Sequence, residues 1–336
     1  MEEVIRLVHG NGGRFSHELM EKHIMKHFRN ALLEPLHDGA QFAVSAGRMA
    51  FTTDSYVVTP AFFPGGNIGK LAVCGTVNDL AMNGAVPKYL SCGFILEEGL
   101  SMEALEKVLT TMEVMADKAG VSIVTGDTKV VERGAVDGIY INTAGVGVIP
   151  DSVHIAPSRV EADMDIILSG SLGDHAVAVM GTRFGLTLPE SIHTDCAPLN
   201  HMVGAVLARE AENVALMRDP TRGGLATVLQ EIADSAQVGI LIKEETLPVH
   251  EDVASVCSML GYDPLYLANE GKVVFFVRRE ATAAILDILH TFDEGKEAVC
   301  IGHTLAKNQG RVGLETVVGG IRLLDMLGED QVPRIC

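Results

Sequence analysis

The sequence predicts a two-domain protein of mixed α+β and α/β structure that ends in a mobile tail. Its 336 residues exceed the length of one typical domain. Strand-like and helix-like segments alternate on both sides of a proline-bounded stretch, 150–157, which is typical of a connector. We therefore expect an N-terminal domain over residues 1–150, a C-terminal domain over 151–323 and a flexible tail over 324–336.

The composition limits the class of partner. Apolar residues make up 47% of the chain and charged residues 21%, which allows large cores, and the net charge is −18. So acidic a chain repels nucleic acids and anionic membrane surfaces, and we expect it to bind neither. No apolar run approaches the roughly 18 residues of a membrane span. The six cysteines show no zinc-ligand spacing and no signal-peptide pattern is visible, so we expect reduced thiols in a cytoplasmic protein.

The N-terminal half begins with a glycine-rich loop and continues as strands and helices. The loop, His9-Gly10-Asn11-Gly12-Gly13, fits either a flap over phosphates or an ordinary flexible turn. Helix start and stop signals predict helices over 68–82 and 101–119, with Asn67 and Ser101 as their caps. The strands expected in this half cover residues 49–55, 88–96, 121–124 and 140–147.

Three aspartates are placed where a metal–nucleotide site can form. Asp54 ends the first strand, Asp79 lies on the apolar helix 68–82, and Asp127 follows the strand 121–124. A carboxylate on so apolar a helix is costly unless it is paired, capped or bound to a metal. Mg²⁺ prefers oxygen ligands and often combines one or two carboxylates with substrate phosphates. The pattern therefore favours a metal site over backbone-bonded aspartates, although the sequence has no Walker motif.

Two further charged residues are candidates for catalysis. Lys129, two residues after Asp127, is suited to balance phosphate charge, although a surface lysine fits the same position. Glu270 lies between two apolar runs, where burial would raise the pKa of its carboxyl group and make it a base. An ordinary glutamate in a turn is equally compatible with this pattern.

The C-terminal half contains a candidate anion site. A strand that starts near Ala215 runs through Asp219 and two glycines into a helix over 225–236. A helix N-terminus with glycines and an arginine, here Arg222, binds anions readily, which favours an anion site over a tight strand–helix turn. His175 opens another predicted helix and is expected to be a capping or core histidine. The other elements expected in this half are strands over 165–170 and 298–302 and helices over 199–211 and 281–289.

The chain ends in Pro333-Arg334-Ile335-Cys336, and the terminal thiol organises our interpretation of the rest. The thirteen residues 324–336 span roughly 40 Å when extended. A thiol on such an arm can be loaded at one place and used at another. An accidental terminal cysteine is the alternative, and it is the better reading of the tail taken alone.

The motifs in this chain together resemble a known superfamily. They are His9-Gly10-Asn11-Gly12-Gly13, Thr53-Asp54-Ser55, Asn78-Asp79, Gly126-Asp127-Thr128-Lys129, Asp219-Pro220-Thr221-Arg222-Gly223-Gly224 and Asn269-Glu270-Gly271-Lys272. This set is similar to that of the PurM-like superfamily, which includes aminoimidazole ribonucleotide synthetase, selenophosphate synthetase and thiamin-phosphate kinase. The ending Pro333-Arg334-Ile335-Cys336 closely resembles that of the HypE family of hydrogenase maturation proteins, which are carbamoyl dehydratases.

The resemblance implies a fold and a reaction. It implies an N-terminal mixed sheet that pairs with its twin across a homodimer to close a shared β-barrel, then a C-terminal α/β domain, with ATP in the cleft. It implies that ATP drives dehydration of a carbamoyl group on Cys336, from S-carboxamide to S-cyanate, with release of ADP and phosphate. The carbamoyltransferase HypF would load the thiol, and the HypC–HypD complex would receive the cyano group at an iron centre for [NiFe]-hydrogenase.

The resemblance also implies roles for single residues. Cys336 would carry the group, Glu270 would take an N–H proton, and Lys129 would stabilise charge on the transferred oxygen. Mg²⁺ is expected on the carboxylates of Asp54, Asp79, Asp127 and Asp219. The residues expected to bind ATP are Gly10, Asn11, Gly12, Gly13, Asn78, Asp79, Thr128, Arg222 and Gly223. The tail is expected to have two positions, with Arg334 paired to phosphate or to a carboxylate when docked.

Two other functions are compatible with the sequence. A small-metabolite ATP-dependent synthetase or kinase of the same superfamily would not need its last four residues for activity. A non-catalytic thiol carrier would neither hydrolyse ATP nor depend on Asp127. Both explain less than the dehydratase does, because the terminal thiol and the acidic set occur together.

Overall fold

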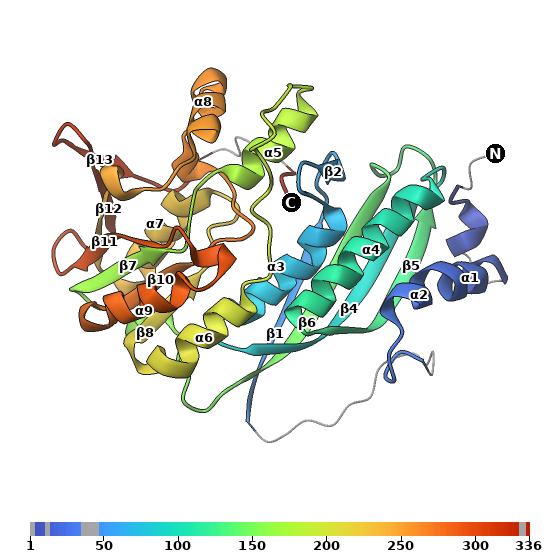
Figure 1. Cartoon of the computed structure of the whole chain (residues 1–336), viewed down its shortest axis with the longest axis horizontal. Coiled ribbons are helices and arrows are strands. Elements are labelled where there is room, and N and C mark those ends of the chain that lie inside the picture. The colour runs from blue at the N-terminus through green and yellow to red at the C-terminus, as the bar shows by residue number, and fades with distance from the viewer. Residues whose placement is uncertain (1–3, 11–13, 35–46, 329–333) are drawn as a thin grey trace.

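The computed structural model describes residues 4–10, 14–34, 47–328 and 334–336. The chain builds two sheets, one in each half of the sequence, and helices pack on both of them (Figure 1). The N-terminal sheet has four strands in the order β1-β6-β4-β5, and the C-terminal sheet has seven in the order β13-β12-β9-β11-β7-β10-β8. Helix α3 lies between the two sheets and contributes to the interface between the halves (Figure 1).

The N-terminal sheet is mixed, because β4 and β5 run parallel while the other neighbours are antiparallel. Helices α3 and α4 cover one face of the sheet (Figure 1), and the opposite face, called the open face below, exposes Phe51 and Ile95 among the described residues. Short elements precede and connect these: a 3-10 turn at Leu7–Gly10, a π-helical turn at Met20–Ile24 and the β2–β3 hairpin. The bounds are α1 (Arg14–Leu19), α2 (Met25–Phe28), β1 (Arg48–Tyr56), β2 (Phe62–Phe63), β3 (Gly66–Asn67), α3 (Ile68–Met82), β4 (Val86–Glu97), α4 (Met102–Ala119), β5 (Ser122–Val131) and β6 (Ile139–Ile149).

Helix α3 begins and ends where local signals predict. The Asn67 side chain accepts hydrogen bonds from the N–H groups of Gly69 and Lys70, which caps the first turn. The helix is buried almost all round because it packs between the sheet and the C-terminal half. Gly75 allows the closest approach to β1, since a Cβ there would lie 2.3 Å from the hydroxyl oxygen of Tyr56. Larger side chains at this position are therefore excluded by the packing of α3 on β1.

The seven-stranded C-terminal sheet packs helices on both of its faces. Helix α7 covers one face through a core that includes Leu225, Leu229 and Phe276. Helices α6 and α9 cover the other face, where neighbouring Phe275 points the opposite way. The bounds are β7 (Met164–Leu168), α5 (Asp174–Arg183), α6 (Asn200–Glu210), β8 (Val214–Arg218), α7 (Gly224–Ala236), β9 (Gly239–Lys243), α8 (Glu251–Leu260), β10 (Val274–Arg278), α9 (Thr282–Leu289), β11 (Val299–Leu305), β12 (Arg311–Glu315) and β13 (Ile321–Leu324).

One strand differs from its prediction in a way that matters for the site. The sequence predicted a strand that stops at Val124, with Asp127 and Lys129 in the loop beyond it. Strand β5 instead continues to Val131, and both residues lie within the ladder opposite β4. The extension follows from pairing, because β4 is itself long enough to bond residues as far as Val131.

No helix in the described part of the chain is both long enough and apolar enough to span a bilayer.

Candidate functional site

A polar pocket of roughly 200 Å³ lies where the two halves meet the end of the chain. Strand β1, helix α3, the loop before α7, the loop before β10 and the terminal residue all contribute to its wall. The lining residues are Thr53, Asp54, Gly75, Asp79, Asp219, Thr221, Arg222, Glu270 and Cys336. The structure thus brings together most of the predicted acidic set, the predicted base and the terminal thiol.

The first two carboxylates of the pocket come from β1 and α3. The Thr52 hydroxyl donates a 2.7 Å hydrogen bond to Oδ2 of Asp79 and fixes that side chain against β1. Burial raises the pKa of Asp79, the bond from Thr52 opposes this rise, and the charge of Asp54 adds to it. A buried carboxylate whose pKa is raised by a second carboxylate nearby is a suitable environment for a bound cation.

Asp219 and Arg222 are placed by a tight loop that leads into α7. Gly224 has a positive φ of 64°, and a Cβ on it would lie 2.5 Å from the carbonyl oxygen of Leu265. This close approach holds the loop against the segment before β10, where both the N–H and the side-chain amide of Asn269 donate to Pro220 O, at 3.0 Å each. Burial, reinforced by the charge of Asp79, raises the pKa of Asp219 to about 7.

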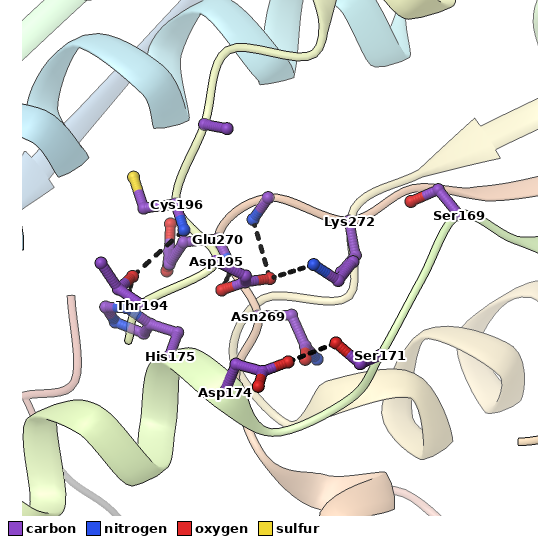
Figure 2. A network of polar contacts seen from close by, with 12 residues as sticks. Ser169, Ser171, Asp174, His175, Thr194, Asp195, Cys196, Asn269, Glu270 and Lys272 are labelled. Carbon is purple, nitrogen blue, oxygen red and sulfur yellow. Dashed lines mark hydrogen bonds and ion pairs between the residues drawn. The ribbon is translucent and has the colours of Figure 1, made fainter. Parts of the chain in front are cut away.

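Glu270 is buried at the back of the site, with 5% of its surface exposed. Its position is set through the backbone, because Asp195 accepts hydrogen bonds from the N–H groups of Glu270 and Gly271, both at 3.1 Å (Figure 2). Oε1 of Glu270 has no hydrogen-bond partner among the residues that the structure describes. Burial, then the charges of Asp195 and Asp219, raise the pKa of the Glu270 carboxyl well above its usual value. Once it is ionised, an unsatisfied buried carboxylate with a raised pKa is a strong base, suited to accept a proton from a substrate.

The last three residues of the chain are docked beside the pocket. The N–H of Val57 donates to an oxygen of the Cys336 terminal carboxylate at 3.1 Å, and the N–H of Thr59 donates to the Arg334 carbonyl at 3.4 Å. Ile335 is 4% exposed and packs into the N-terminal core. The tail predicted as a mobile arm is therefore held at its tip in this structure, because backbone bonds and an apolar anchor fix it.

Arg334 connects the docked tail to the loop before β6. Its Nε donates to Val57 O at 3.0 Å, and its guanidinium lies 2.5 Å from Oδ2 of Asp137. The same guanidinium stacks over the Tyr140 ring with 5.5 Å to the ring centroid. The expected pairing of Arg334 with a carboxylate is thereby confirmed, and Asp137 is the partner.

Asp127, Thr128 and Lys129 do not reach the pocket within one chain. Cross-strand partners lie on the same face of a sheet, and Ser55, Asn142, Gly93 and Asp127 form one such row. Asp127 therefore shares a face with Ser55. Asp54 precedes Ser55 in the strand, so its side chain points to the opposite face. That second face is the one covered by α3, since the Thr143 hydroxyl paired with Asp54 donates to Ala72 O at 2.9 Å.

On the open face, Asp127 and Lys129 pair with each other, and Lys129 Nζ lies 2.5 Å from Oδ2 of Asp127. Gly10 lies in the 3-10 turn that packs near β5. Asn11, Gly12 and Gly13 lie outside the residues that the structure describes. The predicted nucleotide residues therefore fall into two groups, one at the pocket and one near β5.

Asn78 and Gly223 have structural positions next to the pocket. The Asn78 amide donates to Ala197 O at 3.0 Å, and its carbonyl oxygen accepts from the N–H of Leu199 at 2.8 Å. This side chain fastens α3 to the loop that carries Asp195. Gly223 precedes α7 and has a positive φ of 77°, so it shapes the loop that presents Arg222. The assignment of both residues to ATP stays a prediction.

The pocket fits a shared metal–phosphate site better than a metal site made by protein alone. Within the described ranges, no three histidine, cysteine, aspartate or glutamate side chains come close enough to hold a metal ion. Mg²⁺ usually takes one or two carboxylates and completes its shell with phosphates and water. The carboxylates with raised pKa, Asp79 and Asp219, fit that donor set because a bound cation would offset their mutual repulsion.

Two residues of the site carried no functional signal in the sequence. Asp195 lies in an irregular loop with no motif around it, and its role depends on the fold that brings Glu270 to it. His175 was expected to be a capping or core histidine. It is indeed fully buried, yet its Nε2 also lies 2.9 Å from the Ile335 carbonyl of the docked tail. Neither contact is local, so neither leaves a trace in residue spacing.

Comparison with known proteins places the chain in a family. Residues 36–149 match the N-terminal domain of AIR synthase related proteins, and residues 161–315 match the C-terminal domain. The carbamoyl dehydratase HypE of Rhizobium leguminosarum bv. viciae is 48% identical over 332 residues, which cover 99% of this chain and 95% of the relative. The expected PurM-like two-domain α/β fold is thus confirmed.

Two solved structures extend this comparison. Hydrogenase maturation protein HypE in complex with ATP superposes with a TM-score of 0.94 at 47% identity, covering 98% of this chain and 99% of that one. A HypE–HypF complex contains a chain with a TM-score of 0.81 at 43% identity, covering 92% and 99%. Identity at this level over the whole length, with the terminal thiol seated in the acidic pocket, shows that the chain belongs to the HypE family of carbamoyl dehydratases.

Proposed function

We propose that this protein uses ATP to dehydrate a carbamoyl group on its own Cys336, supplying the cyanide ligand for [NiFe]-hydrogenase maturation. The observation that carries the proposal is the position of Cys336, which lines one pocket together with Asp54, Asp79, Asp219 and buried Glu270. The names of the relatives, carbamoyl dehydratases, and the ATP complex of one of them support it. A terminal thiol beside three carboxylates is expected if the thiol carries a group that reacts with a metal-bound nucleotide, and it has no evident structural role there.

The proposed reaction balances with groups that this chain provides. The carboxamide oxygen of S–C(=O)–NH₂ takes the terminal phosphoryl group of ATP, which releases ADP and turns a poor leaving group into a good one. The nitrogen loses its first proton to solvent as the oxygen is phosphorylated, and it loses the second as the C–O bond breaks and phosphate leaves, which forms S–C≡N. Glu270, in its ionised form, is the base for the second N–H proton, because its carboxylate is buried, has a raised pKa and holds an oxygen without a described partner.

The pocket carboxylates are proposed to hold the metal and the phosphates. Asp54, Asp79 and Asp219 would bind Mg²⁺, and Arg222 at the start of α7 would pair with phosphate oxygens. When bound, Mg²⁺ supplies positive charge that stabilises the transferred phosphoryl group. Gly75, which lines the pocket beside Tyr56, keeps the wall open to the tail.

We propose a homodimer that shares the nucleotide site between two copies. The pocket of roughly 200 Å³ is smaller than the roughly 300–1,000 Å³ typical of ligand sites, so one chain encloses only part of a nucleotide. Asp127 and Lys129 lie on the open face, and a second copy packed on that face would bring these groups toward its partner's pocket. Apolar residues exposed on this face support such packing, with Met49 at 43%, Phe51 at 71% and Ile95 at 41% exposure. Pairing of the two sheets would close the shared β-barrel.

The dimer proposal predicts the effect of a charge on the open face. Phe51→Glu is expected to convert the protein to a monomer, because two copies would bury like charges at their contact. The same variant is expected to weaken ATP binding by more than tenfold, since Asp127 and Lys129 would no longer reach the pocket. Sedimentation velocity and nucleotide titration measure the two effects.

Val318→Glu is the matched control for this experiment. Val318 is 89% exposed on the turn between β12 and β13, away from the N-terminal sheet. It should leave both association and ATP binding unchanged. A Phe51→Glu protein that remains a dimer would contradict the proposed interface.

We further propose how the protein operates in its setting. HypF loads the carbamoyl group on Cys336, as the HypE–HypF complex of a relative suggests, and the HypC–HypD complex receives the cyano group. Residues 1–150 form the ATP-binding and dimerisation domain, 151–323 the second domain, and 324–336 the carrier tail. The reaction takes place in the cytoplasm. The tail leaves the pocket for loading and delivery and returns for the chemistry.

Intact-mass analysis tests the proposed function directly. The protein is carbamoylated by HypF and then incubated with and without Mg-ATP, and the C-terminal peptide is weighed. The expected result is the loss of one water from this peptide only when ATP is present. No loss of water with ATP would overturn the proposal. ATP turnover on a small metabolite after removal of residues 333–336 would instead indicate the synthetase or kinase, and no ATP hydrolysis at all would indicate a thiol carrier.

A further inference from the structure

Helix α5 contributes two contacts to the docked end of the chain. His175, in the first turn of α5, lies with Nε2 2.9 Å from the Ile335 carbonyl oxygen. Arg183, in the last turn, donates to the Arg334 carbonyl at 2.7 Å and to the Thr59 carbonyl at 2.8 Å. Both contacts are made to main-chain oxygens of the two residues that precede Cys336.

The hydrogen bonds around His175 can run in one direction only. A carbonyl oxygen accepts and never donates, so Nε2 must carry the proton that is shared with Ile335. Nδ1 of the neutral ring is then an acceptor, and the Thr194 hydroxyl, 2.8 Å away, donates to it. The same hydroxyl oxygen accepts from the N–H of Cys196 at 3.1 Å. The chain of bonds therefore runs from Cys196 through Thr194 and His175 to the tail.

The surroundings keep His175 in this neutral form. Its ring is fully buried and meets the Phe63 ring edge-on with 5.5 Å between the centroids. Burial lowers the pKa of His175, so Nδ1 keeps its lone pair for the Thr194 hydroxyl at neutral pH. Thr194 is itself 8% exposed, and its N–H is bound to Pro64 O at 2.9 Å. Both members of the pair are thus fixed.

The loop that holds His175 also holds Glu270. Asp195, the residue after Thr194, accepts from the N–H groups of Glu270 and Gly271 and pairs with Lys272 at 3.4 Å (Figure 2). Consecutive residues of one loop therefore face the tail on one side and the predicted base on the other. Figure 2 shows that Thr194 lies beside His175 and that the next residue of the loop, Asp195, lies beside Glu270.

We propose that Thr194 and His175 form a positioning pair that sets the docked place of the terminal thiol relative to Glu270. Neither residue touches the reacting atoms. The pair acts by selecting the ring tautomer that grips the Ile335 carbonyl, and the shared loop ties that grip to the backbone of Glu270. The meaning of this pair for catalysis rests on the proposed dehydration, whereas the docking that it controls can be measured without any reaction.

Alkylation of the terminal thiol measures docking. The protein, free of nucleotide and carbamoyl groups, is treated with iodoacetamide, and the modified C-terminal peptide is quantified over time by mass spectrometry. Thr194→Val removes the hydroxyl while keeping the shape, so the proton is no longer directed to Nε2. We expect Cys336 to react about fivefold faster than in the wild type, the effect of one neutral hydrogen bond. ATP-dependent dehydration in a single turnover should slow by a similar factor, because the thiol spends less time beside Glu270.

Two further variants separate positioning from general destabilisation. Thr194→Ser keeps the hydroxyl and should restore the slow alkylation of the wild type. Thr304→Val is the matched control, because Thr304 is fully buried, accepts from the N–H of Met164 at 2.9 Å and donates to Glu161 O. It should lower the melting temperature comparably and leave the alkylation rate of Cys336 unchanged. Equal alkylation rates in Thr194→Val and Thr304→Val would overturn the proposal.

His175→Phe provides an independent test should Thr194→Val fold poorly. Phenylalanine fills the space and can pack on Phe63 but cannot donate to the Ile335 carbonyl, so it should also expose Cys336 to alkylation. If His175→Phe leaves the thiol as protected as in the wild type, the positioning pair is refuted. Failure of the wild type to lose water with ATP would instead sink the proposed function, and the alkylation result would still decide docking.

Discussion

Replacing Glu270 with glutamine is expected to slow ATP-dependent dehydration by about 10²- to 10⁴-fold, the usual contribution of a general base. Glutamine keeps the shape and the backbone bonds to Asp195, but it cannot take an N–H proton. ATP binding should persist, because the phosphates are assigned to other residues. Single-turnover analysis of the carbamoylated C-terminal peptide measures the rate, and nucleotide titration measures binding.

The same variant carries its own check on folding. Because the pKa of Glu270 is raised above the ordinary value of 4.5, the unfolded chain ionises this group at a pH where the folded chain keeps it protonated. As the pH rises above 4.5, the free energy of unfolding therefore falls, because the unfolded chain loses the proton that the folded chain retains. Glutamine removes this penalty, so Glu270→Gln should be at least as stable as the wild type at about pH 8, with a difference that grows with pH.

Glu280→Gln is the matched control, since Glu280 is exposed in the turn before α9. It should change neither the dehydration rate nor the pH dependence of unfolding. A Glu270→Gln protein that dehydrates at the wild-type rate would show that another group removes the proton. A slow variant that is also less stable than the wild type would mean that the carboxylate has a structural role.

Replacing Cys336 with serine is expected to abolish product formation altogether. The thiolate is the form of cysteine that attacks and carries groups, and a serine hydroxyl is a far weaker nucleophile at neutral pH. The docked position should survive, because the contacts described for Arg334, Ile335 and the Cys336 carboxylate do not use sulfur. ATP binding and the melting temperature should therefore match those of the wild type.

Cys300→Ser controls for the loss of a thiol as such. Cys300 is also partly buried, but it lies on β11 of the C-terminal sheet, and burial raises the pKa of its thiol. It should keep full carbamoylation and dehydration in the intact-mass assay. A Cys336→Ser protein that still yields a dehydrated product would remove the terminal thiol from the mechanism.

The helices could be predicted from sequence because their signals are local. Helix α3 runs over Ile68–Met82 as expected, and the caps at Asn67 and Ser101 form the predicted hydrogen bonds. Gly120 ends α4 in the left-handed conformation that glycine favours. Each of these features depends on a few neighbouring residues, so a single sequence contains all the information that is needed.

The two faces of the N-terminal sheet could not be predicted in this way. Asp54 and Asp127 both look like carboxylates near strand ends, and spacing alone suggests that they meet. Which face each side chain takes depends on register with β6 and β4, and one residue of shift reverses it. Pairing partners, unlike helix caps, lie far away in the sequence. The contacts of Asp195 with Glu270 and of His175 with the tail could not be predicted for the same reason, because these partners are 75 and 160 residues away.

The hold on the chain end has a consequence for the order of events. The grip on the Ile335 and Arg334 carbonyls uses atoms that are identical for a bare, a carbamoylated and a cyanated sulfur. These contacts therefore cannot distinguish a loaded thiol from an unloaded one, and they do not by themselves determine when the tail leaves the pocket. Release of the tail after the reaction must instead depend on what the pocket contains or on the protein that accepts the cyano group.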